Sequence, residues 1–273
     1  MGAVFCVGAQ GRRAALASAA LFLGAAAAGP VRAVTELRIA ASADTTIYAE
    51  QSGSTAYDGI SDGSGPSLWT SVIAAGVTRR ALVRFDLSAV PAGARVLSVQ
   101  LQLFEIRARD EHAVRLHRVL AAWGEAGSNG GEAGVGAPAQ PGDATWSHRL
   151  WPDQRWAQRG GDFVATPSSS RVVGFGPASY VWPSTPQQVA DVQGWLAQPS
   201  TNHGWIVIGD DQGLQNAKRF ASRNGSSVDG QPTLIVTVEP GALAVDDTDI
   251  PLPPWALALL GTGLAGALLR RRR

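Results

Sequence analysis

The segment from Arg79 to Ser88 constrains the fold of this chain most, because its side chains alternate with a period of two. One parity holds Ala81, Val83, Phe85 and Leu87, and the other holds Arg80, Leu82, Arg84 and Asp86. This pattern predicts a β-strand with one fully buried face and one mixed face. After a turn at residues 91–93, residues 95–106 alternate in the same way. We therefore expect the two runs to be neighbouring antiparallel strands.

The same alternation recurs along the chain and predicts an all-β fold. Further strand-like runs lie at residues 37–50, 67–73, 114–120, 171–175, 179–182, 205–208, 217–223 and 233–239. One helix is expected after Thr185, since a threonine N-cap followed by proline favours a helix start. We expect an antiparallel β-sandwich, jelly-roll-like, with one short helix. Trp123, Trp195 and Trp205 are expected in its core.

Net charge argues against a nucleic-acid partner. The whole chain has a formal charge of +1, but three arginines precede residue 34 and four follow residue 249. The segment between them has a charge of −6. Nucleic-acid binding requires a concentrated basic face, so this mildly acidic segment predicts no nucleic-acid partner.

The first 33 residues have the pattern of a signal peptide. Arg12 and Arg13 precede an apolar stretch at residues 14–28, and Ala33 offers a small-residue cleavage site. Cleavage would remove Cys6, the only cysteine, and leave a mature chain without a disulfide. The alternative is an N-terminal anchor that is never removed.

The C-terminal end has a second targeting pattern. An acidic linker at residues 241–249 is followed by a proline-rich motif, an apolar run and four terminal arginines in residues 250–273. Together these features resemble the sorting signals read by exosortase-type proteases (PEP-CTERM-like), with a transmembrane helix whose arginine tail stays cytoplasmic. A plain tail anchor is the alternative. Either way, we expect a secreted, cell-surface protein that is membrane-anchored or processed at its C-terminus.

Seven short motifs, in order, resemble those of a DNRLRE domain. They are residues 79–88, 91–94, 123–125, 142–146, 191–195, 202–205 and 232–234. The resemblance covers about residues 38–239, within a domain that we place at 34–240. It implies an extracellular β-sandwich related to a family of carbohydrate-binding modules, and it supplies no catalytic residues.

Three tryptophans at five-residue steps form the best local candidate for a ligand site. Loop tryptophans commonly stack on the apolar faces of sugar rings, beside polar groups that hold the hydroxyls. The predicted polysaccharide-binding residues are Trp146, Trp151, Trp156, His148, Arg149 and Asp153. Alternatively, each of the three tryptophans fills an edge of the sandwich. Arg107, Arg109 and Arg115 are further candidates, for binding an acidic sugar. The alternative is that these three arginines are solvated strand ends.

Metal and catalytic signals are weak. Asp143, Asp153, Asp162, Asp210 and Asp211 lie in expected loops and could bind Ca²⁺, although they match no fixed loop pattern and could simply cap turns. The four histidines lack the spacing of zinc ligands. Residues 59–63 match the nucleophile-elbow motif but lack its strand and helix.

These observations predict a noncatalytic, surface-anchored module that binds polysaccharide or takes part in the extracellular matrix. Its expected partners are exopolysaccharide, the membrane and an exosortase-type protease, and no cofactor other than a possible Ca²⁺ is expected. The alternatives are a structural or adhesive protein without a glycan ligand, and a polysaccharide-degrading enzyme with two carboxylates in a cleft.

Overall fold

The computed structural model describes residues 33–226 and 230–241. Residues 1–32 of the expected signal peptide, most of the acidic linker and the whole expected sorting signal lie outside this range. Within it, no helix has both the length and the apolar character that a membrane crossing requires.

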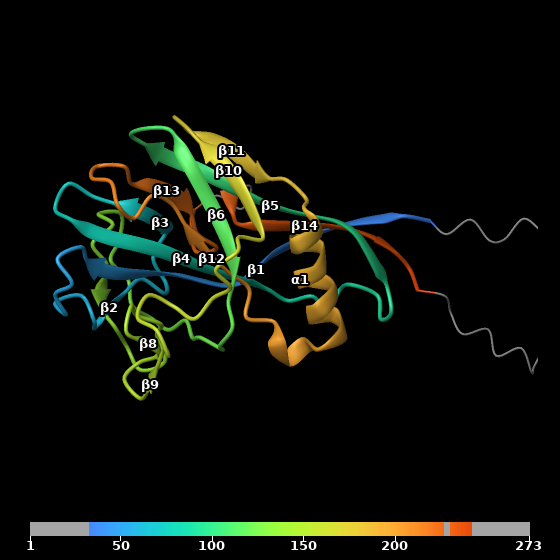
Figure 1. The fold of residues 1–273 in the computed structure, drawn as a ribbon, viewed down its shortest axis with the longest axis horizontal. Helices are drawn as coiled ribbons and strands as arrows, with labels where there is room; N and C mark the ends of the chain where they lie inside the picture. The colour runs from blue at the N-terminus through green and yellow to red at the C-terminus, as the bar shows by residue number, and fades with distance from the viewer. Residues whose placement is uncertain (1–32, 227–229, 242–273) are drawn as a thin grey trace, which may run out of the picture. The chain divides into compact units, whose positions relative to one another are not determined.

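The described residues form an all-β fold with one α-helix and one short 3₁₀ helix (Figure 1). The strands are β1 (Thr35–Glu50), β2 (Ile60–Ser61), β3 (Ser67–Val72), β4 (Val77–Phe85), β5 (Arg95–Ala108), β6 (His112–Arg118), β7 (Ala137–Pro138), β8 (His148–Leu150), β9 (Gln154–Arg155), β10 (Ser169–Val173), β11 (Ala178–Trp182), β12 (Trp205–Ile208), β13 (Lys218–Ala221) and β14 (Thr233–Glu239). The helices are α1 (Pro186–Ala197) and η1 (Pro199–Thr201).

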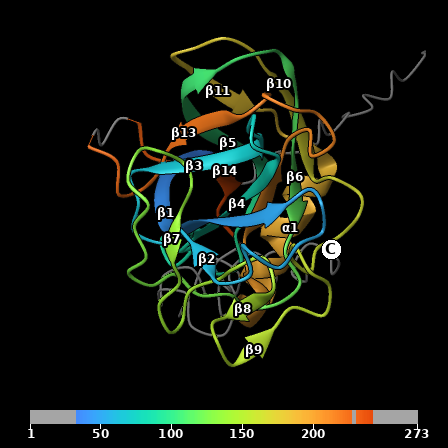
Figure 2. The same cartoon turned by 90° about the vertical axis from the view of Figure 1, so that its left-hand side faces the viewer.

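The described strand pairs are all antiparallel, and twelve strands form one continuous assembly of two sheets, which are joined at one edge through β1 and at the other through the β3–β4 pair (Figure 2). Strands β8 and β9 pair separately. One sheet has the order β3–β13–β5–β14–β1, with β11 on the other edge of β5. The other has the order β10–β6–β12–β4–β1, extended by β2 and β7. Strand β1 pairs with β14 up to Ala40 and with β4 from Ala41, and its register shifts between Ala41 and Ala43.

The main hydrophobic cluster confirms the predicted pattern of the central strand. Val83 and Phe85 of β4 lie in it together with Leu101 of β5, so residues from both sheets share this core. Leu82, on the mixed face of β4, lies in a second cluster with Trp123 and residues of the long loops. Trp123, Trp195 and Trp205 are buried, as expected. Strands β1 and β14, at the two ends of the described residues, pair with each other, and both pack onto the main cluster.

The expected pairing of the two leading strands is wrong. Strand β4 pairs with β1, β3 and β12, whereas β5 pairs with β11, β13 and β14. The connection between them is too long for a tight hairpin and buries Leu87, Val90 and Ala94 in the main cluster. It therefore crosses from one sheet to the other.

Helix α1 begins where the sequence predicts. The Thr185 hydroxyl accepts a hydrogen bond from the Gln188 amide at 3.0 Å, and Pro186 is the first helical residue. The Gln193 side chain ties the helix to β5 through the Val96 amide at 2.9 Å.

Replacing the N-cap should weaken the domain measurably. Thr185→Ala removes the hydroxyl acceptor at the start of α1, and we expect a loss of about 1 kcal/mol in the free energy of unfolding. Thr185→Ser keeps the acceptor and should stay within about 0.5 kcal/mol of wild type. Urea denaturation of residues 33–241 measures both values. Equal losses for the two variants would contradict the capping role.

Candidate functional site

The three predicted tryptophans do not share one surface. Trp156 is only 5% exposed and lies in the second hydrophobic cluster. Its indole nitrogen donates to the Thr145 carbonyl at 2.9 Å. Trp156 therefore has the packing of a core residue, and its ring offers no open face for a sugar.

Trp151 and His148 lie together at the turn between β8 and β9. Their rings meet edge-to-face, 4.7 Å apart, and Trp151 also packs over Gly59. Burial lowers the pKa of His148, which favours its neutral form. Asp153 is exposed in the adjoining turn, and Arg149 donates to the Ala122 carbonyl at 3.1 Å. This part of the predicted site thus has one half-buried tryptophan.

Trp146 lines a separate groove of about 430 Å³. The other lining residues come from β1, β4, the loop after β1 and the loops after β9 and β12: Ala49, Glu50, Gln51, Gly53, Ser54, Thr78, Arg80, Arg159, Asp211 and Gln212. None of the other five predicted site residues lines it.

The groove wall is a cation–π and ion-pair arrangement centred on Arg80. Its guanidinium lies 4.5 Å from the Trp146 ring centroid and pairs with Asp211 at 2.8 Å. It also donates to the Gly160 carbonyl at 2.8 Å. Burial raises the pKa of Asp211, and the charge of Arg80 partly offsets this. The position of Trp146 is therefore set by Arg80 and by packing against the second hydrophobic cluster.

The rim of the groove supplies further polar groups. Arg159 pairs with both oxygens of Asp58, and Gln212 is exposed. An aromatic ring beside guanidinium, amide and carboxylate groups suits a polyhydroxylated ligand, since hydroxyls both donate and accept hydrogen bonds.

The five aspartates considered for Ca²⁺ do not converge. The carboxylates of Asp143, Asp162 and Asp210 each accept hydrogen bonds from backbone amides of nearby turns, and Asp211 pairs with Arg80. Among the described residues, no group of three acidic, histidine or cysteine side chains is arranged to hold a metal.

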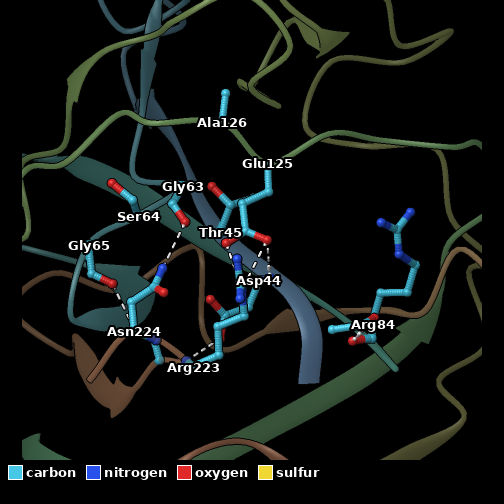
Figure 3. A network of polar contacts seen from close by, with 12 residues as sticks. Asp44, Thr45, Gly63, Ser64, Gly65, Arg84, Glu125, Ala126, Arg223 and Asn224 are labelled. Atoms are coloured by element: carbon cyan, nitrogen blue, oxygen red, sulfur yellow. Dashed lines mark hydrogen bonds and ion pairs between the residues drawn. The ribbon is translucent and has the colours of Figure 1, made fainter. Parts of the chain in front are cut away.

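A buried carboxylate network lies elsewhere, where the sequence alone gave no signal (Figure 3). Asp44 accepts from the Arg223 amide at 2.7 Å, and the Arg223 guanidinium donates to Glu125 at 2.8 Å. The Asp44 amide in turn donates to Glu125 at 3.2 Å. Burial raises the pKa of Asp44 to about 7 and that of nearby Asp62 to about 6. These hydrogen bonds join three segments that are far apart in the sequence: β1 with Asp44, the loop with Glu125, and the residues after β13 with Arg223.

Ser71, His112 and Asp110 form a second unpredicted chain of contacts. The Ser71 hydroxyl lies 3.0 Å from Nε2 of His112, whose Nδ1 lies 3.2 Å from the Asp110 carboxylate. This is the contact order of a nucleophile, a base and an orienting acid. However, Ser71 is fully buried and already accepts the Asp210 amide at 3.2 Å, so a substrate has no access to it.

Comparison with protein-family models finds none that matches this chain, and comparison with curated proteins finds no relative. The resemblance to a DNRLRE domain therefore stays a prediction that rests on the short motifs themselves.

Proposed function

We propose that this protein is a noncatalytic, secreted and surface-anchored module that binds polysaccharide through the Trp146 groove. The observation that carries the proposal is the groove itself, in which one tryptophan stands beside guanidinium, carboxylate and amide groups. Three expectations from the sequence support the same role: the DNRLRE-like order of motifs, the jelly-roll-like sandwich and the two targeting patterns. Ca²⁺ and processing by an exosortase-type protease remain parts of the proposal.

Removing polar groups from the groove should weaken glycan binding without unfolding the domain. Arg159 and Gln212 are exposed, so the double variant Arg159→Gln, Gln212→Ala should keep its stability. We expect its dissociation constant for the host exopolysaccharide to rise at least about fivefold, since each lost polar contact contributes about 1 kcal/mol. Affinity electrophoresis of residues 33–241, with and without Ca²⁺, measures it.

Trp151→Ala is the matched test of the alternative surface at the β8–β9 turn. If the groove is the site, this variant should bind within about twofold of wild type. Loss of binding in Trp151→Ala alone would move the site to the predicted Trp151 cluster. A wild-type domain that binds no exopolysaccharide in either condition would favour a structural or adhesive role.

A further inference from the structure

Arg107, Arg219 and Trp69 form one row on the outer face of the sheet β3–β13–β5. Arg219 of β13 lies directly opposite Trp69 of β3 on one side and Arg107 of β5 on the other. Directly opposed residues of antiparallel strands project from the same face of a sheet. The next residues along, Leu68 and Phe220, are in the main core, so the row faces away from that core.

A β-bulge in β5 places Arg107 in this row. Arg219 pairs with Arg107, but Phe220 pairs with Glu105, so Ile106 is an extra residue without a partner on β13. In a regular strand Arg107 would share the face of Glu105, which is buried. Because of the bulge, Arg107 is exposed, and so is Arg109 two residues further on.

Two guanidinium groups lie within cation–π distance of the Trp69 ring. Those of Arg79 and Arg219 lie 4.6 and 5.4 Å from its ring centroid. Arg79 is fully buried and donates to the Gly134 carbonyl at 3.0 Å, while its Nε and Nη2 have no hydrogen-bond partner among the described residues. Burial lowers the pKa of Arg79 to about 10, so it stays charged at neutral pH. It adds positive charge beneath the row.

The positive charge of this face is largely uncompensated. Within residues 33–226 and 230–241, neither Arg107 nor Arg109 forms an ion pair. Arg219 has Glu132 at 3.5 Å, but that side chain is 76% exposed. The nearby Asp110 carboxylate is engaged by Lys218 at 2.7 Å and by His112. A focused positive face on a segment of charge −6 therefore favours an anionic ligand.

A hollow beside the row gives the ligand a place to lie. It has a volume of about 190 Å³ and is lined by Trp69, Ile73, Arg107, Arg109, Ala133 and Ala217. Arginines supply planar donor pairs that match a carboxylate, and the apolar residues can contact the carbon face of a sugar ring. The hollow is small, which suits one unit of a chain that runs across the sheet.

We propose that this arginine face is a second glycan site, which binds the carboxylate groups of an acidic polysaccharide. The proposal rests on the proposed function only in taking a glycan as the ligand, because the site shares no residue with the Trp146 groove. Arg107 and Arg109 would bind the carboxylates, with Arg219 beside them in the row.

The test is affinity electrophoresis of residues 33–241 in gels that contain polygalacturonate, dextran sulfate or neutral dextran. We expect retardation by polygalacturonate, and a dissociation constant that rises at least about tenfold in Arg107→Gln, Arg109→Gln, since charged bidentate contacts are lost. The control Arg115→Gln, Arg171→Gln removes the same charge from exposed positions on β6 and β10, in the other sheet, and should bind within about twofold. All four positions are exposed, so the variants should fold.

Two results would overturn the proposal: no retardation of wild type by polygalacturonate, whether or not dextran sulfate retards it, or an equal loss in both double variants. The experiments distinguish the failure of one proposed site from the failure of the other. If the Arg159→Gln, Gln212→Ala variant loses exopolysaccharide binding while Arg107→Gln, Arg109→Gln changes nothing, the groove stands and the arginine face falls. The reverse result leaves the arginine face as the glycan site.

Discussion

Gly204→Ala is expected to destabilise the domain by at least about 3 kcal/mol, a large part of a typical domain's stability. Gly204 has a φ of +71°, which side-chain-bearing residues rarely adopt, and an added Cβ would lie 2.0 Å from the Val83 carbonyl oxygen. The backbone at residue 204 cannot move away from Val83 to make room for the Cβ. The next residue, Trp205, pairs with Val83, and the Gly204 carbonyl accepts a hydrogen bond from the Val119 amide at 3.0 Å. Urea denaturation of residues 33–241 measures the loss.

Gly93→Ala is the matched control, because it separates backbone strain from the clash. Gly93 has a φ of +70°, but an added Cβ there would meet no atom within 4 Å. This variant should lose only about 1 kcal/mol, the cost of a left-handed conformation for alanine. If the two glycine variants lost the same amount, the close approach of Gly204 to β4 would not explain its effect.

The strands and the helix could be predicted from the sequence because their signals are local. Alternation places Val83 and Phe85 of β4 in the core, and the Thr185–Pro186 pair marks the start of α1. Strand partners are not local. The pairing of β4 with β12 joins residues more than a hundred positions apart, whereas the matching alternation of β4 and β5 on either side of a turn suggested that these two strands pair.

The candidate site could be predicted only in part, because a tryptophan's role depends on what covers it. Trp146 and Trp156 lie in the same loop-rich segment, yet Trp156 is buried inside the second core cluster, whereas Trp146 packs against that cluster from outside and lines the groove. Arg80, which stacks on Trp146, belongs to β4 and pairs with Asp211, far along the chain. No spacing rule connects these three residues.

The arginine face shows the same limit on a finer scale. Residues 107, 109 and 115 were candidates from their residue type alone, and the structure places Arg115 on β6, in the other sheet from Arg107 and Arg109. Parity along β5 would place Arg107 on the face of Glu105. One extra residue, Ile106, reverses that assignment. A bulge depends on the pairing of β5 with β13, so it has no signature in β5 itself.

Asp44→Asn should make the unfolding free energy less dependent on pH. Burial raises the pKa of Asp44 from 3.8 to about 7 in the folded state, so folding favours its protonated form. The stability from this proton is fully present below pH 3.8 and is lost as the pH rises toward 7. Between pH 4.5 and 8, wild type should lose about 3 kcal/mol relative to the variant.

The difference between the two unfolding curves reports the titration of Asp44 together with the part of the Glu125 and Asp62 titrations that is coupled to its charge. Asparagine can still accept the Arg223 amide through its side-chain oxygen, so the hydrogen bond in this network is kept. Parallel curves for wild type and Asp44→Asn would mean that Asp44 is charged in the folded protein at acidic pH. The contacts with Arg223 would then outweigh the cost of burying the charge.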